Sequence, residues 1–242
     1  MQGLSRALDF EQFEWLSFDC YGTLIDWESG ILSVLKPILT RHGVGVSEEM
    51  ILEAYGEQES RIQKGPYLTY RLVLRRIIEG LGQAWHFVPG ESELRSLEDS
   101  LPEWPPFADT VRSLQRLKRK NKLAILSNID DDLFSGTARL LGVMFDQVLT
   151  AQQLGSYKPS LNNFQALIER LGVPKERILH VAQSPYHDIE PARKAGLATV
   201  WVNRRRGRNT FGATPAARAE PDLEVPDLQS LVSAAGLVEE GE

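Results

Sequence analysis

The sequence predicts an α/β fold, a Rossmann-like doubly wound parallel sheet that carries an inserted all-helical domain. Three observations predict it. The apolar run at residues 15–18 has the length of a buried strand. About eighty residues of helical periodicity follow, with no strand-like alternation. From residue 109 onward, helical and strand-like segments alternate, as in the βα units that build a parallel sheet.

The long helical stretch predicts a separate domain inserted after the first strand. Ser47 with two following acids is a helix start signal, and Gly82 is a stop signal. Pro102, Pro105 and Pro106 punctuate the return to the sheet. We therefore expect a core domain at 1–26 and 105–242 and a helical domain at 27–104. The expected helices of the insertion are 31–43, one from 47 through 55, 66–82 and 93–101.

The second half of the chain predicts the rest of the sheet. The expected helices are 109–119, 130–141, 160–171 and 187–195, and the expected strands are 123–126, 147–150, 178–182 and 198–202. The segment 207–221 is rich in Gly, Ala and Pro, so we expect it to loop over the surface. The arginines at 204–208 are expected to be a solvated loop.

Composition limits the class of protein. Hydrophobic residues make up 42% and charged residues 25%, and the net charge is −6. An acidic chain does not favour nucleic acid or an anionic membrane as a partner, and no apolar run is long enough to span a bilayer. Residues 1–14 do not resemble a signal peptide. With the single thiol Cys20, these features predict a cytoplasmic protein without disulfides.

Polar residues follow four of the expected strands. Asp19 ends the first, and the second is followed by Ser127-Asn128. Lys158 precedes a helix, and the segment 183–188 follows the strand at 178–182. Ligands bind outside the carboxyl ends of strands in open α/β sheets. A parallel sheet brings these groups to one edge, so we expect a nucleophilic carboxylate, polar donors, a lysine and a second acid to meet there.

Each of these residues also has a simpler interpretation. Ser127-Asn128 could cap a helix, Lys158 could be a turn lysine, and Asp188 could serve the first turn of its helix. Cys20 is interpreted as a packing residue rather than a nucleophile, and His187 as structural or exposed rather than a general base. The coincidence at four successive strand ends favours a site.

These motifs resemble those of the haloacid dehalogenase (HAD) superfamily of hydrolases. The resemblance covers the segments 18–24, 126–128, 158–159 and 187–188, and the helical insertion matches the superfamily's cap domain. The Asp-x-Tyr-Gly-Thr motif at 19–23 resembles that of the (S)-2-haloacid dehalogenase type II branch. Segments 19–28, 127–130 and 186–188 are also similar to L-azetidine-2-carboxylate hydrolase.

The resemblance implies a role for each residue. Asp19 would attack a substrate carbon and form a covalent ester, which water then hydrolyses. Lys158 would neutralise and orient Asp19, and Asp188 would position Lys158 or help activate the water. The groups expected to hold the substrate carboxylate or to shape the surroundings of the nucleophile are Tyr21 with its backbone, Thr23, Ser127 and Asn128.

Tyr21 indicates which bond of the substrate the enzyme can break. Superfamily phosphatases carry an acid at this position, which protonates the departing alkoxide, and a phenol with a reference pKa of about 10 is a poor donor near neutral pH. Tyr21 therefore favours displacement at carbon, with neither cofactor nor metal required. The alternatives are that Tyr21 only packs the loop while another acid supplies the proton, or that the chain is a Mg²⁺-dependent phosphatase. A non-catalytic interaction protein on this fold is a third hypothesis.

Two departures from the dehalogenase pattern affect the substrate. Gly56 stands near the place of the halide-binding arginine, and Gln183 and Pro185 replace the usual Ser and Asn of the fourth motif. Glu57 or Glu59 would suit an ammonium, although solvated helix charges are the more frequent role of such residues. We expect a small carboxylic acid as substrate and a monomer or homodimer as the assembly.

Overall fold

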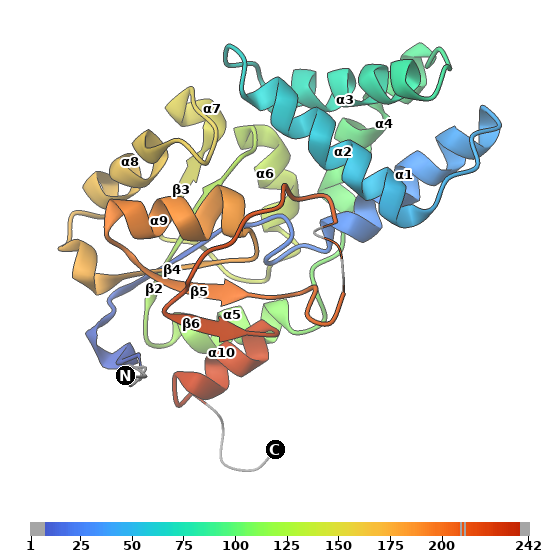
Figure 1. Cartoon of the computed structure of the whole chain (residues 1–242). Coiled ribbons are helices and arrows are strands. Elements are labelled where there is room, and N and C mark those ends of the chain that lie inside the picture. The colour runs from blue at the N-terminus through green and yellow to red at the C-terminus, as the bar shows by residue number, and fades with distance from the viewer. Residues whose placement is uncertain (1–7, 209, 211, 238–242) are drawn as a thin grey trace.

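A single parallel sheet forms the centre of the molecule. The computed structural model describes residues 8–208, 210 and 212–237. Its strands have the order β3-β2-β1-β4-β5-β6, with helices on both sides (Figure 1). The strands are β1 (Trp15–Phe18), β2 (Lys122–Ser127), β3 (Gln147–Thr150), β4 (Ile178–Ala182), β5 (Ala198–Val202) and β6 (Leu223–Val225). The predicted doubly wound parallel sheet is confirmed.

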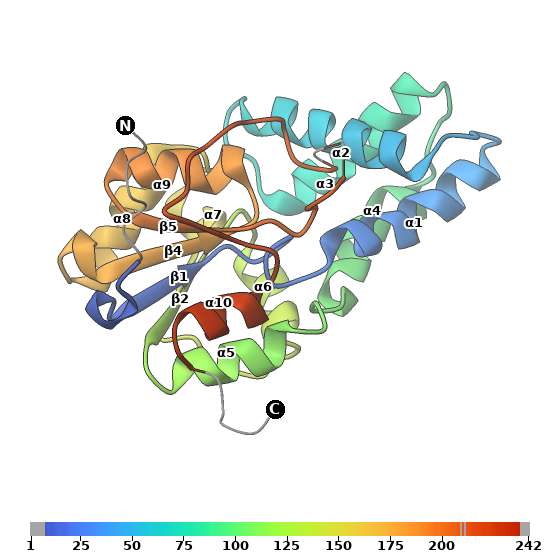
Figure 2. The ribbon, with the colours of Figure 1, turned by 60° about the horizontal axis from the view of Figure 1, so that its bottom comes forward.

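Alternate residues of the strands enter two different cores. On β2, Leu123 and Ile125 belong to the cluster that contains residues of the helices α5, α6 and α10. Their neighbours Ala124 and Leu126 belong to the cluster that contains residues of α8 and α9. Because successive side chains of a strand point to opposite faces, both faces are apolar and covered (Figure 2). These helices are α5 (Thr110–Lys118), α6 (Asp131–Ala138), α8 (Leu161–Leu171), α9 (Glu190–Ala195) and α10 (Leu228–Ala234).

The predicted strands at 147–150, 178–182 and 198–202 have the predicted bounds. β6 and α10 were not predicted, because three residues are too few to show a period of two and α10 has only seven. The helix expected at 187–195 begins instead with a π-helical turn. The remaining short elements are η1 (Phe10–Gln12), η2 (Leu101–Glu103), α7 (Ala151–Leu154), η3 (Lys175–Arg177) and the π-turn η4 (Pro185–Ile189).

The stretch between β1 and α5 is helical, as predicted. Its helices lie beyond one end of the sheet (Figure 1). The two connections to it run side by side, since Asp26 N donates to Pro105 O over 2.8 Å. The division into domains at 1–26, 27–104 and 105–242 stays a prediction, and its ends at 1–7 and 238–242 lie outside the described residues. The helices are α1 (Trp27–Arg41), α2 (Glu48–Gln63), α3 (Tyr70–Ala84) and α4 (Glu91–Ser100).

Helix α3 begins at Tyr70 rather than at the predicted residue 66. The preceding Thr69 makes no side-chain cap. Asp130, which follows β2, accepts hydrogen bonds from the backbone N–H groups of Tyr70 and Arg71 at 2.9 and 3.1 Å. Unpaired N–H groups at a helix start are satisfied by such a carboxylate. A residue of the sheet domain thus fixes where this helix begins.

The connection between β5 and β6 differs from the surface loop that we expected. Arg204 makes two hydrogen bonds to Asp109, at 2.8 and 3.0 Å. The Arg205 side chain is buried and paired with Glu28 and Glu49. The expected solvated basic loop is therefore wrong for these two arginines, because each has acidic partners that are distant in sequence.

The same connection packs against the helical insertion (Figure 2). Ala213 and Thr214 are buried. A Cβ at Gly56 of α2 would lie 2.4 Å from the carbonyl oxygen of Ala213. The close approach of the two backbones therefore requires glycine at position 56.

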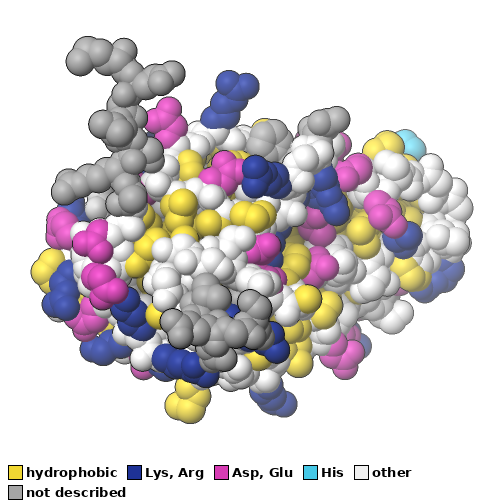
Figure 3. Space-filling view, turned by 90° about the horizontal axis from the view of Figure 1, so that it is seen from below, with side chains coloured by type: hydrophobic (Ala, Val, Ile, Leu, Met, Phe, Trp, Pro, Cys, Tyr) yellow, Lys and Arg dark blue, Asp and Glu magenta, His cyan; other side chains and the backbone are white. Residues whose placement is uncertain are grey.

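The charges of the surface are mixed. Figure 3 shows lysine and arginine interspersed with acidic side chains on the face that it presents, without a continuous basic region. In the part of the chain that the structure describes, no helix has both the length and the apolar character needed to cross a bilayer.

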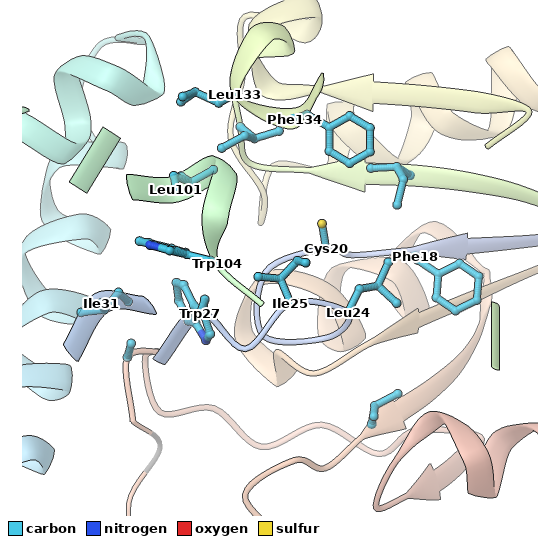
Figure 4. Close-up of a cluster of buried hydrophobic side chains, with 14 of the residues drawn as sticks. Phe18, Cys20, Leu24, Ile25, Trp27, Ile31, Leu101, Trp104, Leu133 and Phe134 are labelled. Atoms are coloured by element: carbon cyan, nitrogen blue, oxygen red, sulfur yellow. The ribbon is translucent and has the colours of Figure 1, made fainter. Parts of the chain in front are cut away.

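Cys20 is a packing residue, as we expected. It is fully buried and lies among apolar side chains from the first loop, η2 and α6 (Figure 4). Burial raises the pKa of the thiol well above its ordinary value. A thiol held in its neutral form is a poor nucleophile.

The contact of Gly56 with Ala213 gives the first testable prediction. Gly56→Ala should destabilise the fold by about 1–3 kcal/mol, because the methyl group meets rigid backbone. Gly80→Ala in α3 is the matched control, since its Cβ would meet only the end of the Gln58 side chain. It should be neutral, or stabilising by up to about 1 kcal/mol. Urea unfolding measures both, and equal stabilities for the two variants would contradict the prediction.

Candidate active site

Asp19 lies at the carboxyl end of β1, the strand where the winding of the sheet reverses direction. Its backbone N–H donates to Val181 O of β4 over 3.2 Å, and the chain then turns sharply. Gly22 has a φ of +91°, and a Cβ there would lie 2.9 Å from Trp27 Nε1. Only glycine adopts this conformation without strain. The turn leaves the Asp19 carboxylate at the strand end, where ligands bind in such sheets.

The ammonium group of Lys158 lies between two carboxylates. Its Nζ is 2.8 Å from Asp19 Oδ1, 2.6 Å from Asp188 Oδ1 and 2.8 Å from Leu126 O. The side chain is 1% exposed. Burial alone would lower the pKa of Lys158, but the charges of Asp188 and Asp19 outweigh it and raise that pKa. Lys158 therefore stays charged and holds both acids.

Asp188 is held from its other side by a pair of polar residues inside the sheet. His180 Nε2 lies 3.0 Å from Asp188 Oδ1, and its Nδ1 lies 2.8 Å from Ser17 Oγ. Ser17 and His180 are register partners on β1 and β4. Burial raises the pKa of Asp188, but Lys158 and His180 outweigh burial, so the net shift is downward. We did not single out this pair, because polar residues within a strand run give no separate signal.

Two of the predicted residues orient the charged groups. Thr23 Oγ1 donates to Asp19 Oδ2 over 2.9 Å and accepts from Gln183 N over 2.8 Å. The Asn128 amide bonds both sides of the Lys158 backbone, accepting from its N–H at 2.7 Å and donating to its C=O at 3.0 Å. The Thr23 hydroxyl and the Asn128 amide are therefore engaged in hydrogen bonds within the protein.

The pKa of Asp19 is shifted upward. Burial raises it, and the nearby charge of Asp188 adds to the effect. Lys158 and the hydrogen bond from Thr23 oppose the shift without cancelling it. A partly desolvated carboxylate of this kind is more basic than an exposed one, which favours nucleophilic attack once it is ionised.

A small pocket opens in front of Asp19. Its free volume of about 40 Å³ is room for about three water molecules. Two buried polar atoms in its wall, Ser127 Oγ and His187 Nε2, have no hydrogen-bond partner. Burial lowers the pKa of His187 to about 4, so the imidazole is neutral. The pocket is lined by Asp19, Tyr21, Trp27, Glu59, Tyr70, Ser127, Asn128, Lys158, Gln183, Ser184, His187, Asp188 and Thr214.

Tyr21 lines this pocket, but its hydroxyl is used elsewhere. It is 2.9 Å from Thr137 Oγ1 of α6. The ring meets Trp104 edge to face, with centroids 6.3 Å apart. Burial raises the pKa of Tyr21 well above its ordinary value. The phenol is therefore a weaker proton donor than a free tyrosine.

Glu59 lines this pocket, although acids at such helix positions are more often solvated surface charges. It is 4% exposed, while Glu57 is exposed. Tyr70 OH donates to Glu59 Oε1 over 2.7 Å. Burial raises the pKa of Glu59 to about 7. The helical spacing could have indicated this, because Ile51, Tyr55 and Glu59 recur every four residues on one face of α2.

The acids of the site do not fit a divalent cation. The ammonium of Lys158 occupies the position between Asp19 and Asp188 that a metal bound to both would take. Within the described ranges there is no group of three or more His, Cys, Asp or Glu side chains that could hold a metal ion.

Comparisons with known proteins show what this chain is similar to. The model of the haloacid dehalogenase-like hydrolase family matches residues 14–196. The (S)-2-haloacid dehalogenase of Pseudomonas fluorescens is 28% identical over 197 residues, covering 78% of this chain and 84% of that protein. A crystal structure of an L-2-haloacid dehalogenase has a TM-score of 0.77 at 24% identity and covers 93% of this chain and all of that one.

A further structural neighbour carries a bound group. The L-2-haloacid dehalogenase of Xanthobacter autotrophicus, solved with chloropropionic acid covalently bound, has a TM-score of 0.75 at 23% identity. The likeness covers 90% of this chain and 96% of that one. At this identity, the comparison establishes the shared fold.

The position of Lys158 gives a prediction about stability. Lys158→Met should cost about 3–5 kcal/mol at pH 7, because it leaves two buried carboxylates without a counter-charge. The loss should shrink as the pH falls, since protonation of Asp19 and Asp188 removes the unpaired charges. Lys36→Met breaks an exposed pair with Glu48 and should cost less than about 1 kcal/mol. Urea unfolding at pH 7 and pH 5 tests this, and similar costs for both variants would contradict it.

Proposed function

Because this chain belongs to the haloacid dehalogenase-like hydrolase family, we propose that it displaces a leaving group from a carbon atom of a small carboxylic acid, with Asp19 as nucleophile. The observation that carries the proposal is the buried pair of Asp19 and Lys158, 2.8 Å apart, beside a tyrosine at position 21. A buried lysine keeps the carboxylate charged and oriented, while Tyr21 offers no proton to an alkoxide.

The proposed reaction has two steps. An oxygen of Asp19 attacks the substrate carbon, the bond from that carbon to the leaving group breaks, and its electron pair departs with that group. Water then adds to the carbonyl carbon of the resulting ester, which releases a hydroxy acid and restores the Asp19 carboxylate. The contact of Lys158 Nζ with Asp19 Oδ1 supports a role for Lys158 in stabilising the negative charge that develops on that oxygen during this addition.

The other predicted residues have supporting roles. Asp188 holds Lys158, and Thr23 orients Asp19 through the hydrogen bonds described above. Ser127 Oγ and His187 Nε2, which lack partners inside the protein, are suited to bind the substrate carboxylate, because buried polar groups are nearly always paired. The small volume of the pocket suits a substrate of a few heavy atoms.

The proposal requires neither a metal nor another cofactor, and the phosphatase alternative has less support. The backbone of Ala213 against Gly56 leaves no space for an arginine side chain at position 56, so the halide-binding group expected from the resemblance is absent there. We propose a small carboxylic acid as the only partner, with neither nucleic acid nor membrane, in the cytoplasm and as a monomer or homodimer.

Isotope labelling tests the ester. After turnover of a small acid substrate in ¹⁸O-water, mass spectrometry should find ¹⁸O in the peptide that contains Asp19, because water attacks the ester carbonyl of the enzyme. Asp19→Asn should lose at least about 10³-fold in kcat while its melting temperature changes little. A phosphatase would hydrolyse an aspartyl phosphate by attack at phosphorus, which leaves Asp19 unlabelled and requires Mg²⁺. Label confined to the product would contradict the proposal.

The acid limb of the pH profile tests the state of Asp19. Its pKa is raised, and the ionised form reacts, so kcat/KM should fall as the pH drops through a value above the reference of about 3.9. Thr23→Val removes a hydrogen bond that stabilises the ionised form, so it should move the limb to higher pH. A limb that does not move in Thr23→Val would contradict this role.

A further inference from the structure

Glu59 is a buried acid without a basic partner. None of the ion pairs within residues 8–208, 210 and 212–237 includes it. Its hydrogen-bond contact is the hydroxyl of Tyr70. Lys158, the cation in the pocket lining, already has three acceptors. Buried charges in proteins are normally paired, so an unpaired carboxyl in the wall of a binding pocket indicates a partner that comes with the ligand.

The charge of the whole pocket points in the same direction. Its described lining contains three acids, Asp19, Glu59 and Asp188, against the single cation Lys158. His187 is neutral, as shown above. A substrate that is only a carboxylate would add another negative charge to this set. A substrate that also carries a cation would balance it.

Hydrogen bonds between buried side chains hold Glu59 in position. Tyr55 OH lies 3.1 Å from Tyr70 OH, which in turn donates to Glu59. Tyr70 is fixed because Asp130 bonds the first N–H groups of α3. The two tyrosines are buried. A carboxylate that is already held by a chain of hydrogen bonds loses little conformational freedom when it binds a ligand, which favours specific recognition.

We propose that Glu59 binds a protonated amine of the substrate, and that this amine is the leaving group. The inference rests on the proposed function and names its substrate class: a small carboxylic acid with an ammonium group on the carbon that Asp19 attacks. When the C–N bond breaks, its electron pair stays on a nitrogen that already carries protons. The departing amine therefore needs no external acid, and Glu59 holds it before and after the step.

Two probes of similar size test the proposal. L-azetidine-2-carboxylate carries a ring ammonium whose strain weakens the C–N bond, and (S)-2-chloropropionate carries no cation. Glu59→Gln should lower kcat/KM for the amino acid at least tenfold more than it lowers kcat/KM for the haloacid, which offers Glu59 no cation. Glu57→Gln is the matched control, because it makes the same change on an exposed residue of the same helix, and it should affect neither probe.

The pH dependence distinguishes recognition from a structural role. The pKa of Glu59 is about 7, so KM for the amino acid should fall as the pH rises through that value. The other ionisable groups that line the pocket are Asp19, Tyr21, Tyr70, Lys158, His187 and Asp188, and Tyr55 contacts Tyr70 behind them. The difference between wild type and Glu59→Gln isolates Glu59 from all of these. Tyr70→Phe removes a hydrogen bond that lowers this pKa, so it should move the transition to higher pH.

The outcomes separate this inference from the proposed function. Equal losses for both probes in Glu59→Gln, or a pH transition that persists in it, would overturn the role of Glu59. If ¹⁸O enters Asp19 with the haloacid while the amino acid is neither bound nor hydrolysed, the ester route stands and the ammonium proposal fails. If neither probe labels Asp19, the proposed function fails as well.

Discussion

The ammonium of Lys158, held between Asp19 and Asp188, is the interaction on which the rest of the site depends. Three charged groups are buried together there, and burial of any one alone would be strongly unfavourable. The sheet makes the arrangement possible, because β1 and β4 are neighbours and the π-turn after β4 carries Asp188, so both acids reach Lys158. Asn128 then fixes the backbone from which Lys158 extends.

A second constraint joins the helical insertion to the sheet. Asp130 follows β2 yet satisfies the first N–H groups of α3. This bond sets the position of Tyr70 and, through it, of Glu59. The pocket is therefore lined by residues of the sheet domain, such as Asp19 and Lys158, and by residues of the helical insertion, such as Glu59 and Tyr70. In the proposed function, the first group reacts and the second recognises the substrate.

Two residues of the pocket, Tyr21 and Glu59, bear on the supply of protons. Tyr21, with its hydroxyl on Thr137 and its pKa raised, does not replace the acid that a phosphatase needs. Glu59, one of the two acids of α2 whose sequence position could suit an ammonium, is an acid in the same pocket. Its pKa of about 7 means that it can be charged or neutral near neutral pH, so the charge on the helical side of the pocket changes in this range.

The sequence by itself determined the α/β class, the helical insertion and the set Asp19, Ser127-Asn128, Lys158 and Asp188, because strand and helix periods and strand-end positions are local signals. Only the tertiary structure decided which groups face each other. The start of α3, the burial of Arg205 and the contact of Ala213 with Gly56 all depend on partners far away in the chain. Glu59 shows the reason: its spacing marks a helix face, but what covers that face is set by packing between segments, which no local pattern encodes.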